Sequence, residues 1–245
     1  MTRPPRPRGP LCPFYIPHMA TLELPIFPLG VVLFPGTPHA LHIFEPRYRQ
    51  MLADCLGGSQ RFGLSFVAPS RDADPAPSVG DVGCIAVVRA SHLLPDGRSN
   101  ILALGEERYV LSEYLDMDLP YRTARVETFD DDDADVPQLT EIATSVRGAF
   151  AHFMAGMQAL TDRGAAPVDL PSDAKHLSFH VCAALEIDAA AKQALLTLRS
   201  TIARLETIDR LLRPLNEELG RRVRVHVRAR GNGKGGTTHD IARAT

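Results

Sequence analysis

Residues 24–36 read LPIFPLGVVLFPG, a strongly apolar stretch that three prolines interrupt. Proline cannot donate a backbone hydrogen bond, so within sheets it is confined to edges, strand starts and bulges. A flat central strand therefore does not suit this stretch. The pattern instead predicts short strands that bend, as strands do around a small barrel.

Strand signals continue along the chain to about residue 126. β-rich or alternating runs lie at residues 31–34, 39–44, 61–67, 82–94, 100–104, 108–115 and 121–126. In the second of these runs the alternation places Leu41 and Ile43 on one face and His42 and Phe44 on the other. The first half of the chain is therefore expected to be a meander of short strands.

Helices are predicted at two places. One is inserted among the strands, because Pro46 suits a first helical position and the pair Gly57-Gly58 suits a helix end. From Pro137 onward the apolar residues recur at steps of three and four, which is typical of amphipathic helices. Three helices are predicted in this part, as residues 137–160, a helix capped by Ser172, and a long helix capped by Asp188 in which Pro214 produces a kink or an end.

These patterns predict an α+β protein in which a β-rich subdomain with a side helix precedes a helical bundle. Five segments are expected: a disordered N-terminal extension at 1–18, the β-rich subdomain at 19–128, an acidic linker at 129–136, the helical subdomain at 137–220 and a basic flexible tail at 221–245. The acids at 130–133 repel one another, so an extended, solvated linker is expected there rather than a Ca²⁺ or Mg²⁺ site.

Composition narrows the class of protein. The chain has 245 residues, a net charge of −2 and 44% hydrophobic residues, as in an ordinary globular protein. No run approaches the ~18 apolar residues of a membrane helix, and the N-terminus lacks the apolar core of a secretory signal. The four cysteines lack metal-ligand spacing, so reduced thiols and a cytoplasmic protein are expected. Basic ends on an acidic body argue against a nucleic-acid-binding domain.

Several residue patterns resemble reaction or metal centres. Ser172 and Lys175 have the S-x-x-K spacing of the serine β-lactamases, but the accompanying SDN and KTG elements are absent. His176 and His180 could share a metal on one helix face, but no third ligand is evident. The glycines of GNGKGG at 231–236 match G-x-G-x-x-G without the βαβ unit that the motif requires. No enzyme activity, metal or cofactor is therefore predicted.

An ordered set of short motifs runs through the first half of the chain. Its members are Leu24-Pro25, Pro28-Leu29, Phe34-Pro35-Gly36, Ile43-Phe44-Glu45, Arg47-Tyr48, Val79-Gly80 with Gly83, Pro95-Asp96-Gly97, and Gly105 with Arg108. Together they resemble the N-terminal substrate-binding domain of the Lon protease family, over about residues 22–215. A full Lon protease continues into an ATPase and a Ser–Lys peptidase. Because this chain has no G-x-x-x-x-G-K-[ST], it is similar to the stand-alone Lon-domain proteins.

The resemblance implies a twisted, barrel-like β subdomain followed by a helical subdomain. It also implies structural roles for the motif residues Pro25, Pro28, Pro35, Gly36, Glu45, Arg47, Gly105 and Arg108. Among these, Gly105 is expected to permit a tight strand connection. Arg108 is expected to pair with an acid such as Glu45 or Glu106.

The resemblance further implies a non-catalytic module that recognises exposed apolar segments of unfolded or partner polypeptides, or hands such clients to a separate protease. An apolar groove between the subdomains, or a sheet edge that accepts another strand, would serve this purpose. Candidate contacts are Phe34, His42, Phe44 and Tyr48, although Phe34 and Phe44 are more simply explained as core.

Two alternatives remain open. One is a small-molecule-binding or sensory protein with a pocket in the β subdomain, lined by His39, His42, His92 and Tyr109, or in the cleft between the subdomains. The other is a hydrolase that uses the serine and lysine of the S-x-x-K motif.

Overall fold

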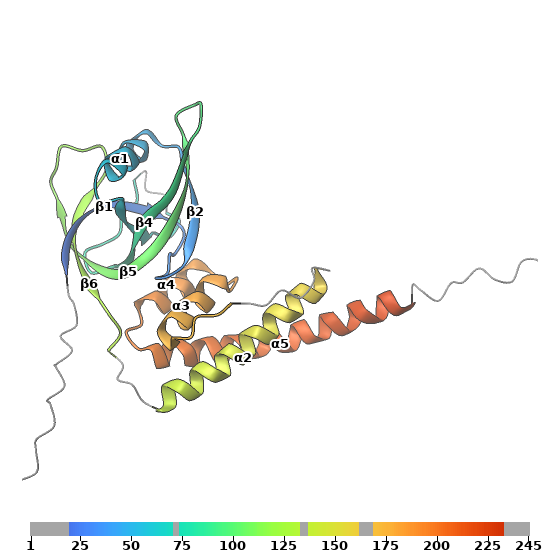
Figure 1. Ribbon diagram of the computed structural model, residues 1–245. Coiled ribbons are helices and arrows are strands. Elements are labelled where there is room, and N and C mark those ends of the chain that lie inside the picture. The colour runs from blue at the N-terminus through green and yellow to red at the C-terminus, as the bar shows by residue number, and fades with distance from the viewer. Residues whose placement is uncertain (1–19, 71–73, 133–136, 162–168, 233–245) are drawn as a thin grey trace, which may run out of the picture.

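The computed structural model describes residues 20–70, 74–132, 137–161 and 169–232, and it has two parts (Figure 1). The first part holds six strands and one helix: β1 (Thr21–Leu29), β2 (Pro38–Ile43), α1 (Pro46–Gly57), β3 (Arg61–Phe66), β4 (Val82–Leu93), β5 (Ser99–Leu115) and β6 (Thr123–Phe129). The second part holds four helices: α2 (Pro137–Leu160), α3 (Ala174–Ala184), α4 (Ala189–Thr197) and α5 (Thr201–Asn232). The predicted α+β class is confirmed.

The proline-broken stretch lies in and after β1, which changes its neighbour halfway along. Residues 21–25 pair antiparallel with β6, whereas residues 26–29 pair parallel with β3. Pro25 is the last residue paired to β6, and Pro28 lies in the half paired to β3. The predicted strand at 31–34 is wrong, because the chain there is irregular and leads into a turn at Gly36, whose φ of +72° is left-handed.

The sheet is twisted and barrel-like, as expected. Its strand order is β2-β5-β4-β3-β1-β6, and β5 also pairs with β6. Strand β5 has 17 residues, of which 99–110 pair with β4 and 108–115 pair with β6. The pairings therefore return to β5, while β2, among the strands that the structure describes, pairs only with residues 99–104 of β5, on the edge whose residues 108–115 pair with β6. The sheet and its strands are seen in Figure 1.

Three apolar clusters hold the molecule together. One lies within the sheet around Ile26 and Tyr109, and a second lies between the sheet and α1 around Met51. The third contains Phe34 and Phe129 from the β subdomain together with the buried faces of all four bundle helices. The two parts therefore share a core rather than meeting through solvent.

Cysteines contribute to these clusters as buried thiols. Cys55, Cys84 and Cys182 are free and buried. Burial raises the pKa of Cys55 to about 11 and that of Cys182 to about 12, so both thiols are protonated at neutral pH.

The helical subdomain corrects three boundaries. The side chain that caps α3 belongs to Asp173, which accepts from the His176 amide at 2.9 Å, and not to Ser172. Asp188 caps α4 as predicted, but the helix ends at Thr197, and Ser200 accepts from the Ala203 amide at the start of α5. The single long helix predicted here is therefore two helices.

Helix α5 is longer than expected. It continues past Pro214 to Asn232, so the tail predicted from residue 221 and the strand-like appearance of RVRVHV are wrong up to that residue. Arginine is a good helix former, and Arg221 and Arg222 both pair with Glu218 one turn earlier. The segments predicted at 1–18 and beyond 232 lie outside the described residues. No helix in the described ranges is long and apolar enough to cross a membrane.

Candidate functional site

Two of the four predicted peptide-contacting residues are buried. Phe34 is 0% exposed and packs near Phe179 of α3, with ring centroids 6.2 Å apart. Tyr48 is 6% exposed and lies against Phe27, at 4.4 Å between ring centroids. Their prediction as surface contacts is wrong, because the chain before Gly36 enters the shared core and α1 turns Tyr48 toward the sheet.

The other two residues lie together on the surface at the end of β2. Phe44 is 58% exposed, and the ring of the exposed His42 is stacked near it at 6.0 Å. The Nδ1 atom of His42 is 2.7 Å from Oδ1 of Asn100 on β5, which fixes the imidazole on this face. Ile43 is 1% exposed on the opposite face, so the alternation predicted from the sequence is correct.

Strand β2 is an edge strand of the sheet. Within the described residues it pairs with β5 alone, from Pro38 opposite Leu104 to Ile43 opposite Ser99. Its outward face continues onto β5 through Leu102, which is 42% exposed and opposite Ala40. An edge strand presents unpaired backbone donors and acceptors, which are a template for another strand. Sequence reasoning missed Leu102, although the alternation in residues 100–104 carried the signal.

A cleft of about 550 Å³ lies between α1 and the β4–β5 hairpin. Leu56 of α1 and Leu93 of β4 line it, and they are 41% and 69% exposed. Gly97 at the hairpin turn has a φ of +80° and lies against the guanidinium of Arg49. This cleft was not predicted, because its two walls are far apart in the sequence.

Two further hollows lie between the subdomains. One of about 260 Å³ is lined by the charged residues Glu106, Glu107, Asp130 and Lys175, so it is not the apolar groove that was predicted between the subdomains. The other lies at the start of β2 and is lined mainly by apolar residues.

The predicted small-molecule pocket does not form as proposed. Tyr109 is 0% exposed inside the sheet, where its hydroxyl is 2.7 Å from the hydroxyl of Ser65. His42 and His92 lie in one row on the exposed face, each opposite Asn100, whereas the half-buried His39 lies near α4. The four residues therefore do not line one cavity.

Other contacts hold both residues of the S-x-x-K pair. Nζ of Lys175 donates to both carboxylate oxygens of Asp130, at 2.8 and 3.0 Å, and the carbonyl of Ser172 accepts from Arg147. Nδ1 of His176 is 2.7 Å from the α3 cap Asp173. Lys175 thus fastens α3 to Asp130, and His176 contacts the cap of its own helix.

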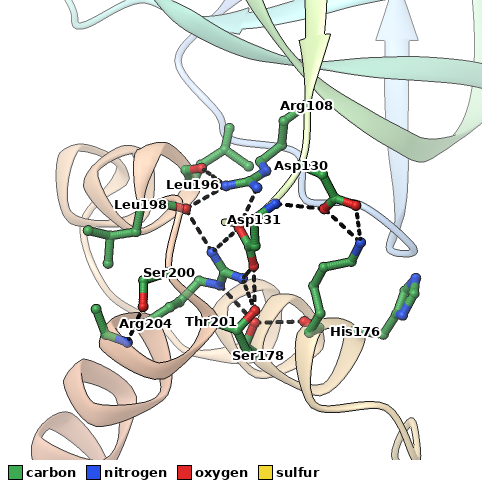
Figure 2. A network of polar contacts seen from close by, with 12 residues as sticks. Arg108, Asp130, Asp131, His176, Ser178, Leu196, Leu198, Ser200, Thr201 and Arg204 are labelled. Carbon is green, nitrogen blue, oxygen red and sulfur yellow. Dashed lines mark hydrogen bonds and ion pairs between the residues drawn. The ribbon is translucent and has the colours of Figure 1, made fainter. Parts of the chain in front are cut away.

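A buried ion network joins the two subdomains (Figure 2). Asp131, whose side chain is 5% exposed, accepts from Arg108 of β5 and from Arg204 of α5. Arg108 also donates to the carbonyls of Leu196 and Leu198, at 3.0 and 2.5 Å. The network therefore ties β5 to the break between α4 and α5.

This network corrects two expectations. Arg108 pairs with Asp131, not with Glu45 or Glu106, whose partners are Arg47 and Arg61. Within the acidic linker, the Asp131 side chain is buried in this network rather than solvated. The sequence did not predict Asp131 and Arg204 as members of this network. The only available signal was Arg204 itself, a charged residue within the apolar stripe of α5.

Electrostatics favour the ionised form of the central carboxylate. Burial alone would raise the pKa of Asp131, but the hydrogen bond and charge of Arg204 and the charge of Arg108 outweigh it. The pKa of Asp131 is therefore lowered. Both arginines of the network lie over aromatic rings. The guanidinium of Arg108 lies 4.4 Å from the ring centre of Phe129, and the guanidinium of Arg204 lies 4.1 Å from the ring centre of Phe179.

Gly105 of the motif set permits close backbone approach. A Cβ on Gly105 would lie 2.2 Å from the carbonyl oxygen of Phe34, and the Gly105 amide donates to the Thr37 carbonyl at 3.0 Å. This packs the Pro35-Gly36 turn directly onto β5. Arg47 bonds Glu45 at 3.0 Å and also Asp74, which holds the start of α1 to the loop before β4.

The fold defines the class of this protein: a barrel-like sheet is joined to a helical bundle by a buried ion network, and β2 forms an edge strand of the sheet. The chain belongs to the family of the ATP-dependent protease La (LON) substrate-binding domain, whose family model matches residues 23–213. The resemblance predicted from the motifs is thereby confirmed.

Individual relatives agree with this assignment. The Lon proteases of Brucella suis biovar 1 and Brucella melitensis biotype 1 are each 25% identical over 183 residues, which is 74% of this chain and 22% of theirs. The chain thus spans about a fifth of the length of the curated relatives it matches.

Solved structures show the same fold. A Lon N-terminal domain protein from Xanthomonas campestris matches with a TM-score of 0.54 and 23% identity, over 76% of this chain and 96% of that one. The N-terminal domain of the Mycobacterium avium complex Lon protease matches with a TM-score of 0.60 and 14% identity, over 80% and 98%.

Proposed function

We propose that this protein is a non-catalytic module that binds extended polypeptide segments along the edge strand β2. The observation that carries the proposal is an edge strand with an exposed face, on which His42 and Phe44 stack and Leu102 lies open. Membership of a substrate-binding family supports a polypeptide as the bound species.

The physical basis is strand addition. Main-chain hydrogen bonds to β2 would supply affinity for any extended segment, and alternate side chains would select among sequences. Apolar side chains of the segment would lie against Phe44, which excludes water from both partners. Folded proteins would bind weakly, because their backbone groups are already paired.

The bound polypeptides would be unfolded or partner chains in the cytoplasm, which a separate protease could then receive. The contacts of Lys175 with Asp130 support a role without peptide cleavage, since they occupy the only candidate base of the S-x-x-K pair.

The test is binding of a labelled apolar peptide to the wild type and to Phe44→Ser. Because the chain has no tryptophan, a tryptophan in the peptide reports on the peptide alone. Loss of one buried aromatic contact is expected to weaken binding by about tenfold. The matched control is Val225→Ser, which removes an apolar side chain that is 67% exposed on α5 and should leave affinity unchanged.

Amide hydrogen exchange identifies the surface. Addition of the peptide should slow exchange in residues 38–43 of β2, because a new strand protects its free backbone groups. Protection confined to α1 and the β4–β5 hairpin would instead place the peptide in the 550 Å³ cleft and contradict strand addition.

A further inference from the structure

A pocket of about 270 Å³ lies where β2 begins, between the loop before it and helices α3 and α4. Val31 and Val32 form one wall, and Ala183 and Ile187 form the other. Pro38 and His39, the first two residues of the edge strand, also line it. The pocket is therefore continuous with the strand on which we propose that polypeptides bind.

The titratable side chains that line this pocket are all basic. Its described lining residues include Lys192 and His39 and no carboxylate, although the body of the chain is acidic. The nearest acids along the chain are Glu186, which is exposed, and Asp188, whose Oδ1 accepts from the Ala191 amide. Burial lowers the pKa of His39, and the positive charge of Lys192 lowers it further.

Lys192 retains capacity for a ligand. Its Nζ donates to the carbonyl oxygen of Ala183 at 3.0 Å. An ammonium group carries three donors, so further donors remain after this bond. An anion beside them would gain a charge-assisted hydrogen bond, while any apolar group attached to it would contact the two valines and Ile187.

We infer that this pocket binds the C-terminal carboxylate of a polypeptide whose last residue is apolar. The inference rests on the proposed function, and it adds that the site recognises the C-terminal end of the bound polypeptide. The volume is below that of an ordinary drug-sized site, which suits one terminal residue rather than a segment passing through. Lys192 supplies the opposite charge, and β2 supplies the path for the preceding residues.

The arrangement also sets the direction of the bound chain. With its carboxylate beside Lys192 at the Pro38 end, the polypeptide runs antiparallel to β2. Its upstream residues then extend toward Phe44, and antiparallel pairing gives straight backbone hydrogen bonds.

The test compares a labelled apolar peptide that has a free C-terminal carboxylate with the same peptide as its C-terminal amide. Wild type is expected to bind the free acid about tenfold more tightly, the size of one charge-assisted bond. Lys192→Met should reduce this preference to none while leaving the affinity for the amide unchanged. Such a pattern assigns the carboxylate to Lys192.

A second variant keeps the test informative if Lys192→Met does not fold. Ala189→Glu places a carboxylate in the same lining at the first position of α4, where acids favour a helix. It should also abolish the preference for the free acid, and thermal unfolding verifies that both variants are folded.

Equal binding of acid and amide by wild type, with the peptide still bound, would overturn the inference and leave the proposed function standing. If neither peptide binds, the proposed function fails and this inference with it. Binding of hexanoate as tight as that of the free-acid peptide would also overturn it, because the pocket would then serve a small carboxylate.

Discussion

Asp131 supplies the buried negative charge that joins the two subdomains. It faces the guanidinium groups of Arg108 and Arg204, and all three side chains are at most 5% exposed. Asp131→Asn removes the negative charge and leaves two buried cations together, which is expected to lower the free energy of unfolding by about 3 kcal/mol. Urea denaturation at neutral pH measures this loss.

The matched control is Glu113→Gln, which breaks the exposed pair with Arg125 on the sheet surface. Solvent screens that pair, so the urea midpoint should hardly change. Similar losses in both variants would contradict a special role for the buried carboxylate.

The same residue predicts a dependence on pH. Because the folded-state pKa of Asp131 is lowered, its contribution is present above the unfolded value of about 4 and is lost as the pH falls through the folded value. The difference in stability between wild type and Asp131→Asn should therefore shrink on acidification from pH 7 to about pH 3. A constant difference across this range would contradict the assignment.

Gly105 gives a steric prediction. Gly105→Ala would place a Cβ 2.2 Å from a backbone oxygen of residue 34, and backbone yields less readily than a side-chain tip. The expected cost is about 1–3 kcal/mol in unfolding free energy. Gly148→Ala is the control, since nothing lies within 4 Å of its Cβ position in α2 and alanine favours a helix. It should be neutral or stabilising.

Single residues were predicted unevenly from the sequence. The outward face of β2 followed from a local pattern, the alternation of side chains, whereas the close approach at Gly105 followed from the resemblance to the Lon substrate-binding domain. The partner of Arg108 could not be predicted, because Asp131 is 23 residues away and Arg204 is 96 residues away along the chain. Burial of Phe34 likewise depends on helices that come much later.

At the scale of elements, α5 contains an exposed proline that does not end it. Pro214 has no amide hydrogen to donate to the turn before it, so the helix loses one backbone hydrogen bond there. Pro214→Ala should raise the free energy of unfolding by up to about 3 kcal/mol, since no packing is lost at an exposed site. Thermal unfolding measures the gain.

Glu217→Ala, an exposed change on the same helix, should shift stability by no more than about 0.5 kcal/mol. A fall in stability for Pro214→Ala would show that the proline shapes α5 in a way that the bundle requires.

Elements with a strong apolar period were predicted well, and those set by tertiary contacts were not. The bounds of α1 and α2 follow from the prolines at their first positions, the glycines after α1 and the apolar periodicity. The break between α4 and α5 escaped notice because leucines continue through it. In the structure the carbonyls of Leu196 and Leu198 at this break accept from arginine side chains, so distant residues stabilise the interruption.

At the scale of the whole molecule, the two parts were predicted as successive subdomains, and their shared core was not. Phe34, Val82 and Phe129 of the first part pack in one cluster with the bundle helices. The candidate polypeptide site was predicted only in its exposed half, His42 and Phe44. The rest of the site, Leu102 and the pocket at Lys192, could not be predicted without knowing which strands and helices become neighbours.

Shared packing predicts that the two parts unfold together. Scanning calorimetry of the wild type should give one transition whose calorimetric and van't Hoff enthalpies agree. Asp131→Asn weakens the ionic joint but leaves the apolar clusters of the sheet intact. The variant should therefore show the bundle melting first, as a second and earlier transition or a broadened one. Two separate transitions in the wild type would mean that the joint couples the subdomains too weakly to make the edge strand and the Lys192 pocket a single rigid surface.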